Sequence, residues 1–144
     1  MKYMSKMMGA LLGGAMMMGA LALPATSWAA DKSKVVIQVS TNDQATWNLA
    51  LNNAQNIQKD VGKDNVDIEI VSFGPGISML KAESEVANRI VEAVDSGMQV
   101  MACQNTMRNQ KINKEDMNSK VGYVPSGAVE IMRRQQQGYA YLRP

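Results

Sequence analysis

Histidine is missing from all 144 residues of this chain, and its absence excludes several kinds of catalysis. Ser-His-Asp and Cys-His mechanisms need an imidazole as general base. Cys103 is the only cysteine, so a zinc site would have at most one soft ligand from each chain. The segment STNDQ at 40–44, which follows the first predicted strand, contains no glycine. The dinucleotide-binding fingerprint and the phosphate-binding loop are therefore both excluded.

Net charge and aromatic side chains are also scarce. The chain has 15 Lys and Arg residues and 13 Asp and Glu residues. Two of the basic residues are Lys2 and Lys6, and every acidic residue lies beyond them, so the rest of the chain has 15 minus 2, or 13, positive charges against 13 negative ones. Aromatic residues make up 5% of the chain. With neither a basic face nor an aromatic platform, we expect no nucleic acid and no anionic membrane surface as a partner.

The amino-terminal residues have the pattern of an export signal. A short basic lead precedes an uncharged apolar run over 7–23, and Pro24 separates that run from small residues that suit signal peptidase. We predict a signal peptide over 1–29 that is cleaved after Ala29, leaving a periplasmic domain over 30–144 with no stable membrane association. An uncleaved anchor is the alternative, but the run is short for a bilayer and is diluted by glycines.

Short β-branched runs alternate with amphipathic segments in the rest of the chain. The predicted strands are 35–40, 66–73, 98–103, 121–124 and 139–142. The predicted helices run from a cap at 41–43 to Gly62, over 86–97, over 104–109, from a capping box at 113–116, and from Ser126 to Gln137. Three helices end at a glycine that a strand soon follows, which is typical of parallel sheets. We therefore predict a single three-layer α/β domain with a mainly parallel five-stranded sheet, helices on both faces and the flavodoxin-like strand order 2-1-3-4-5.

Side-chain alternation adds two predictions about how these elements are placed. The second predicted strand has Asp67 and Glu69 on one face, a pattern that suits a strand near the edge of a sheet. The last predicted helix has an inner face that is expected to include Val129, Met132 and the aliphatic stem of Arg133.

Ligands of open α/β sheets bind beyond the carboxyl ends of the strands, where the order of the connections reverses. This rule selects Cys103, Asn105 and Thr106 after the third strand, Gly74, Pro75 and Gly76 after the second, and Ser40 and Asn42 after the first. The thiol would lie at the start of a helix, which favours a thiolate by about 0.3–1 kcal/mol. That is too little for a strongly acidic thiol, so hydrogen bonds from nearby amides, or a nearby Arg108 or Lys111, are also needed. We expect a moderately reactive thiol that is presented to solvent.

Each feature of this predicted site also has a purely structural interpretation. A lone cysteine after an apolar strand is often a small buried side chain, although an unpaired cysteine in an exported chain indicates a reactive or intermolecular thiol. The Gly-Pro-Gly segment is more typical of a tight turn than of close approach to a ligand. The methionines are more typical of core packing than of copper binding, and Glu83 and Glu85 more of helix capping than of catalysis. We predict no metal site and no cofactor.

These residues, taken together, resemble a known family. Four stretches carry the resemblance: WNLALNNAQN, FGPGISML, CQNTM and YVPSGAVEIM. They are similar to the DsrE/DsrF-like sulfur-relay family, which includes TusD, and most similar to its small exported members. The resemblance extends from Val35 to Pro144. It implies that Cys103 carries sulfur as a persulfide and passes it to a partner's thiol. It also implies a homotrimer or homohexamer with the cysteine near a subunit contact, and a thiol-bearing protein as sulfur donor or acceptor.

Three classes of function follow from the residues. The leading hypothesis is a periplasmic sulfur carrier or sulfurtransferase-like protein, because thiolate exchange through Cys103 needs no histidine. The second is a non-catalytic oligomeric module that binds a small ligand, or a soft metal such as Cu(I) through Cys103 with Met101 or Met107. The third is an interaction protein with an inert, buried thiol.

Overall fold

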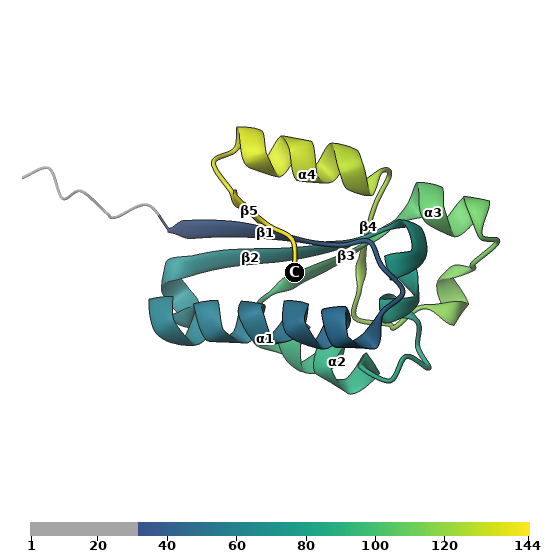
Figure 1. Cartoon of the computed structure of the whole chain (residues 1–144), viewed down its shortest axis with the longest axis horizontal. Helices are drawn as coiled ribbons and strands as arrows, with labels where there is room; N and C mark the ends of the chain where they lie inside the picture. Colours follow the sequence, from purple (N-terminus) through teal and green to yellow (C-terminus); the bar gives the residue numbers. More distant parts are fainter. Residues whose placement is uncertain (1–31) are drawn as a thin grey trace, which may run out of the picture.

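Five parallel strands form one sheet in the computed structural model, which describes residues 32–144 (Figure 1). The strands are β1 (Ser33–Val39), β2 (Val66–Ser72), β3 (Gln99–Cys103), β4 (Gly122–Val124) and β5 (Ala140–Leu142). Every neighbouring pair is parallel, so the sheet is wholly rather than mainly parallel. The predicted signal peptide over 1–29 lies outside the described residues.

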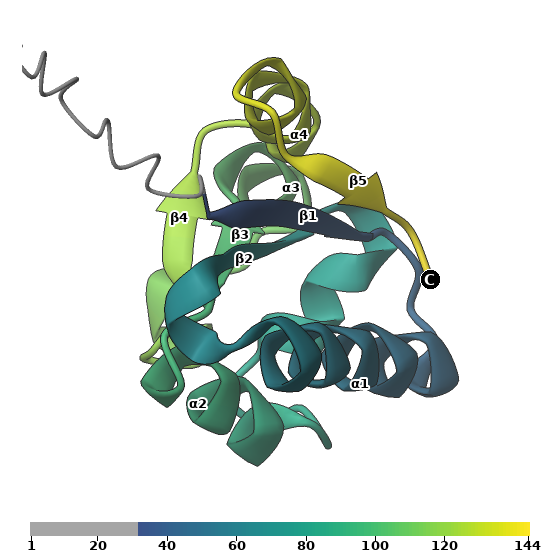
Figure 2. The same cartoon turned by 90° about the vertical axis from the view of Figure 1, so that its left-hand side faces the viewer.

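Helices cover both faces of this sheet, which confirms the predicted three-layer α/β domain. The α-helices are α1 (Gln44–Val61), α2 (Ala87–Asp95), α3 (Gln104–Asn109) and α4 (Gly127–Gln136). Three short 3₁₀ helices connect them: η1 (Lys63–Asn65), η2 (Gly74–Leu80) and η3 (Lys114–Asp116). Figure 2 shows α1 and α2 together on one face and α4 on the other. None of the helices within 32–144 combines the length and apolar composition that crossing a bilayer requires.

The predicted strand order 2-1-3-4-5 is wrong. The observed order is β4-β3-β2-β1-β5, which makes β2 the central strand and not an edge strand. The chain adds β2, β3 and β4 successively on one side of β1, and then returns through α4 to place β5 on the other side of β1. Because parallel crossovers are right-handed, the outward and return connections must lie on opposite faces of the sheet. This is why α4 is separated from α1 and α2.

Local signals set the helix ends as predicted. The Asp43 side chain accepts a hydrogen bond from the Thr46 amide at 2.8 Å and caps α1. Gly62 follows the same helix with a φ of 96°, a conformation that an L side chain rarely adopts. Asn113 and Asp116 form the predicted capping box, and it begins the short 3₁₀ helix η3.

The two faces of the sheet are packed very differently. The α1 and α2 face carries a large apolar core that includes Ile37, Leu51, Ile70, Leu80 and Ile90. The buried cluster on the α4 face contains four residues: Val36, Val71, Val124 and Ile131. Phe73, Met101 and Tyr139 pack at its margin and are partly buried.

The predicted inner face of α4 is wrong. Val129 is 38% exposed and Met132 is 51% exposed, and Arg133 is exposed as well. The residues that α4 buries are Gly127 and Ile131. Apolar spacing gave the wrong face because the inner side of the helix consists of a glycine, one isoleucine and charged side chains, whereas Val129 and Met132 lie on the exposed side together with Arg133.

Candidate functional site

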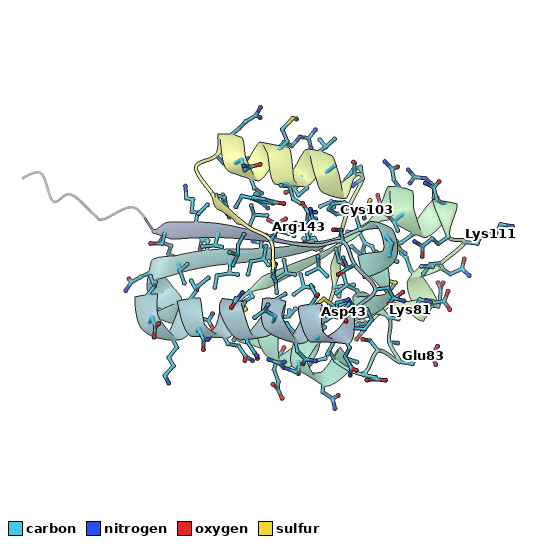
Figure 3. All side chains as sticks on the ribbon, viewed as in Figure 1. Asp43, Lys81, Glu83, Cys103, Lys111 and Arg143 are labelled. Atoms are coloured by element: carbon cyan, nitrogen blue, oxygen red, sulfur yellow. The ribbon has the colours of Figure 1, made fainter. Side chains whose placement is uncertain are left out.

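Cys103 is the last residue of β3 and immediately precedes α3. It pairs in register with Val124 at the end of β4 and lies on the α4 face of the sheet, as Met101 does. In Figure 3 it lies at the end of the sheet that adjoins α3 and the first turn of α4. Cys103 is 4% exposed, so the prediction of a solvent-presented thiol is wrong for the single chain.

The reversal of the connections explains why the thiol lies in this place. After β3, the chain packs Met107 and Met117 into the core on the α1 and α2 face. After β4, the chain turns to α4 on the other face. The carboxyl ends of β3 and β4 therefore flank the point where successive connections separate, which is where open α/β sheets form their ligand crevice.

Hydrogen-bond donors surround the sulfur and make the thiol more acidic. Burial raises the pKa of Cys103, but the hydroxyl of Thr106 and the amides of Thr106, Gly127 and Asn105 lie close to the sulfur and together lower the pKa by more. The net pKa lies below the ordinary value of 9.0. Donors of this kind stabilise a thiolate, whereas a purely apolar pocket would suppress it.

Thr106 links the thiol to the Gly-Pro-Gly turn. Its hydroxyl oxygen accepts a hydrogen bond from the Gly74 amide at 2.9 Å, which leaves the hydroxyl hydrogen free to point at the sulfur. The side chain of Gln110, at the carboxyl end of α3, donates to the Gly74 carbonyl at 3.1 Å. Both ends of α3 are therefore hydrogen-bonded to Gly74. Gly74 therefore acts on the site through Thr106.

The rest of the Gly-Pro-Gly turn supports the sheet. A Cβ at Gly76 would lie 2.4 Å from the carbonyl oxygen of Val39, so only glycine fits between this turn and the end of β1. Pro75 is exposed and occupies the first turn of η2. Pro75 and Gly76 therefore form a structural turn and are not placed to contact a ligand at Cys103.

The predicted residues after β1 do not join the thiol. Ser40 accepts a hydrogen bond from the Gln38 side chain at 3.1 Å. Asn42 is exposed and lines a separate cavity of about 340 Å³ together with Trp47 and Lys81. This separation follows from the strand order, because β2 lies between β1 and β3.

Gly127 is a residue of the candidate site that was not predicted from the sequence. It is the first residue of α4, and its amide is one of the donors that face Cys103. A Cβ at this position would lie 2.8 Å from the Phe73 ring, so the absence of a side chain lets α4 approach the sheet closely. The Asn105 amide donates to the Pro125 carbonyl at 3.2 Å, which ties α3 to the same loop. Applying the carboxyl-end rule to the fourth predicted strand would have found this segment.

The arrangement does not favour a soft-metal site. Met101 packs on the α4 face, whereas Met107 belongs to the core on the opposite face. Met107 therefore lies on the opposite face from Cys103, and Met101, which shares its face, is the one of the two methionines on the same side as the thiol. Within residues 32–144, no group of three or more Cys, Asp or Glu side chains is placed to hold a metal ion.

Comparison with known proteins gives a consistent result. The DsrE/DsrF-like family matches residues 33–144. MTH1491 from Methanobacterium thermoautotrophicum, a protein of unknown function, is 32% identical with a TM-score of 0.75, covering 78% of this chain and 100% of its own. BT1422 from Bacteroides thetaiotaomicron, also a protein of unknown function, is 19% identical with a TM-score of 0.65. The match covers 78% of this chain and 95% of BT1422.

The ychN protein from E. coli is 12% identical with a TM-score of 0.63, covering 79% of this chain and 99% of its own. At these identities, BT1422 and ychN show a shared fold alone. No curated protein matches the chain. The family match spans nearly every described residue, including Cys103 and the whole sheet, so the chain belongs to the DsrE/DsrF-like family.

Proposed function

We propose that this protein is a periplasmic sulfur carrier that accepts sulfane sulfur on Cys103 as a persulfide and passes it to the thiol of a partner protein. The observation that carries the proposal is the set of polar groups that lie close to one buried sulfur atom and lower its pKa: the Thr106 hydroxyl and the amides of Thr106, Gly127 and Asn105. An inert core cysteine needs none of them. Membership in a family that includes sulfur-relay proteins supports the same conclusion.

The chemistry needs only thiolates. The Cys103 thiolate attacks the outer sulfur of a donor R–S–S⁻, the donor S–S bond breaks, and R–S⁻ leaves with the electron pair. Cys103 then carries S–S⁻. An acceptor thiolate R′–S⁻ attacks that outer sulfur, forms R′–S–S⁻ and releases the Cys103 thiolate. Neither step needs an external oxidant or a histidine base, provided that enough thiolate is present at neutral pH.

The donors around the sulfur assist both steps. They stabilise the free thiolate before attack and again when Cys103 leaves as a thiolate at the end of the cycle. Because Cys103 is 4% exposed in the single chain, a donor reaches it when the loop over 125–127 moves aside. That loop contacts the site through the Pro125 carbonyl and the Gly127 amide.

The proposal includes an oligomer and an exported location. A homotrimer or homohexamer is supported by two large apolar side chains, Val129 and Met132, that are exposed on α4, the helix whose first residue lies near Cys103. Native mass spectrometry of the purified protein should give a trimer or hexamer, and a monomer at micromolar concentration would contradict this part. Cell fractionation with sequencing of the mature amino terminus should find the protein in the periplasm, starting at Ala30.

The sulfur chemistry is tested with the reduced protein and two donors, inorganic polysulfide and thiosulfate. Intact mass spectrometry should show added sulfur that dithiothreitol removes. The Cys103→Ser variant differs by one atom and serves as the matched control, and it should accept nothing. Transfer is then followed by mixing the loaded protein with a small thiol and observing loss of the adduct. Absence of any adduct on the folded wild-type protein with both donors would refute the proposed function.

A further inference from the structure

The helix that contributes Gly127 to the site is held to the sheet by very little apolar contact. Ile131 is its one large buried apolar side chain. Its other buried residue, Gly127, has no side chain. Apolar contact is not directional, so these contacts alone would allow α4 to slide or tilt on the sheet. Another interaction must set the position of the helix.

A buried cluster of charges supplies that interaction at the other end of α4. The Nε atom of Arg134 is paired with the carboxylate of Glu69 and lies 2.9 Å from the Glu130 carboxylate. The side chain of Glu69 is 1% exposed, and that of Arg134 is 22% exposed. Within residues 32–144, Arg134 is the one cation paired with Glu69. A buried carboxylate that has a single partner holds that partner strongly, because losing it leaves the group without compensation.

The same guanidinium makes three further contacts that define its direction. Its Nη2 atom donates to the Gln99 side chain at 3.3 Å, and its Nη1 atom donates to Gln137 at 3.3 Å. Its central carbon lies 5.2 Å from the centre of the Tyr139 ring. Glu69 and Gln99 are paired neighbours on β2 and β3, so Arg134 is anchored to two central strands of the sheet at once.

We infer that Arg134 is a positioning residue for Cys103, because its pairs with Glu69 and Glu130 set the place of α4 on the sheet and so hold the Gly127 amide against the sulfur. Gly127, Ile131 and Arg134 are four and three residues apart, so they share one side of the helix. Gly127 and Arg134 are about 10 Å apart along the helix axis, at about 1.5 Å per residue. A short α-helix is rigid over this distance, so an anchor at one end positions the other.

The test measures the ionisation of Cys103 in variants of the full protein. The rate of alkylation by iodoacetamide is followed against pH, and the single cysteine makes the signal unambiguous. Arg134→Met should lower the thiolate fraction at neutral pH about tenfold, the effect of losing one hydrogen bond to a charged acceptor. Arg133→Met is the matched control. It removes an equal charge from an exposed neighbour on the same helix and should leave the profile unchanged.

The outcomes separate positioning from general electrostatics. A shift in Arg134→Met but not in Arg133→Met supports the inference. Equal shifts in both variants, or no shift in a folded Arg134→Met protein, overturn it. If Arg134→Met does not fold, Glu69→Gln decides instead, since it keeps the shape of the side chain and removes its charge. A smaller shift in the same direction is expected there, and an unchanged profile overturns the inference.

The inference rests on the proposed function for its significance, but its readout does not require sulfur transfer. Failure to load sulfur together with a shifted pH profile would remove the proposed function and leave the positioning role intact. Normal sulfur loading together with an unshifted pH profile in Arg134→Met would leave the proposed function intact and remove the positioning role of Arg134.

Discussion

The two faces of the sheet differ in what holds them together. The α1 and α2 face is a continuous apolar core, whereas the α4 face combines a four-residue apolar cluster with a buried group of charges. The thiol lies on the second face. Regions with few buried apolar contacts open more readily than the core, and functional sites are often drawn from them. The difference indicates that one face determines whether the domain folds, while the other determines how the thiol behaves.

The largest effect should come from the apolar face. Leu51 is fully buried, and Leu51→Ala should lower the free energy of unfolding by about 2–5 kcal/mol, because it removes apolar contacts and leaves a cavity. Leu49→Ala on the same helix is the control. Leu49 is 47% exposed, so its loss should change stability by no more than about 0.5 kcal/mol. Urea denaturation measures both, and equal losses would contradict the assignment of this core.

Ile131→Ala, the corresponding change on the α4 face, should act locally. Amide hydrogen exchange should accelerate in α4 and at Cys103, while α1 remains protected. Equal acceleration in both helices would show that the two faces open as one unit.

The charges on the α4 face should give a pH dependence of stability. Burial raises the pKa of Glu69 to about 7 from its usual 4.5, with Arg134 acting against this and Glu130 adding to it. The folded protein therefore binds this proton more tightly than the unfolded chain does. The stability that the proton contributes is complete below about pH 4.5 and is lost as the pH rises through about 7. The expected loss is about 3–4 kcal/mol, from a pKa difference of 7 minus 4.5 at about 1.4 kcal/mol for each unit.

Chemical denaturation of the wild type and Glu69→Gln across this pH range measures the effect. The glutamine variant cannot titrate at this position, so its stability should lack this fall. Glu83→Gln, which changes an exposed carboxylate, should retain the wild-type slope. The same slope in wild type and Glu69→Gln would show that Glu69 does not take up the proton.

Closing the space at Gly127 should affect the thiol more than the fold. In Gly127→Ala the new methyl would lie 2.8 Å from the Phe73 ring, so the first turn of α4 must move outward and carry its amide away from Cys103. The pKa of the thiol should rise and its alkylation at neutral pH should slow by about tenfold or more. Ser126→Ala is the control, because that side chain makes no capping hydrogen bond. Adding Phe73→Leu should restore part of the rate; no change in Gly127→Ala would contradict the proposed contact.

The smallest expected effect is that of a single hydroxyl. Thr106→Val keeps the shape of the side chain but removes its donor to the sulfur and its acceptor for the Gly74 amide. The pKa of Cys103 should rise toward its ordinary value, so the reaction rate should reach its half-maximum at a higher pH. Thr106→Ser restores the hydroxyl and should recover most of the wild-type profile. An unchanged profile in the valine variant would remove Thr106 from the site.

Much of the architecture was predictable because local patterns carry it. The alternation of β-branched runs with amphipathic segments predicted all five strands, and Asp43 and Gly62 marked the two ends of α1. Cys103 was placed at a strand end for the same reason, and Thr106 followed from its position on the next turn. Asn42 was predicted for the same site and lies elsewhere, because its inclusion depended on a strand order that no local pattern records.

Glu69 shows most clearly why the remainder was not predictable. An acidic residue in a strand favours an exposed edge, yet β2 is central and this carboxylate is buried. Its buried charge is compensated by Arg134, which lies 65 positions later in the sequence. Arg134 is on α4, the helix that connects β4 to β5. Arg134 is also the reason that the predicted inner face of α4 was wrong. The inner side of this helix carries Arg134, whereas Met132 faces outward.

By itself, the sequence determined which segments are strands or helices, where α1 ends and that one thiol follows a buried strand, because backbone period, capping and glycine conformation act over a few neighbouring residues. Tertiary structure alone decided the strand order, the burial of Glu69 and the approach of Gly127 to Cys103. These depend on packing and charge pairing between distant segments, for which the energy is gained only once the whole sheet has assembled.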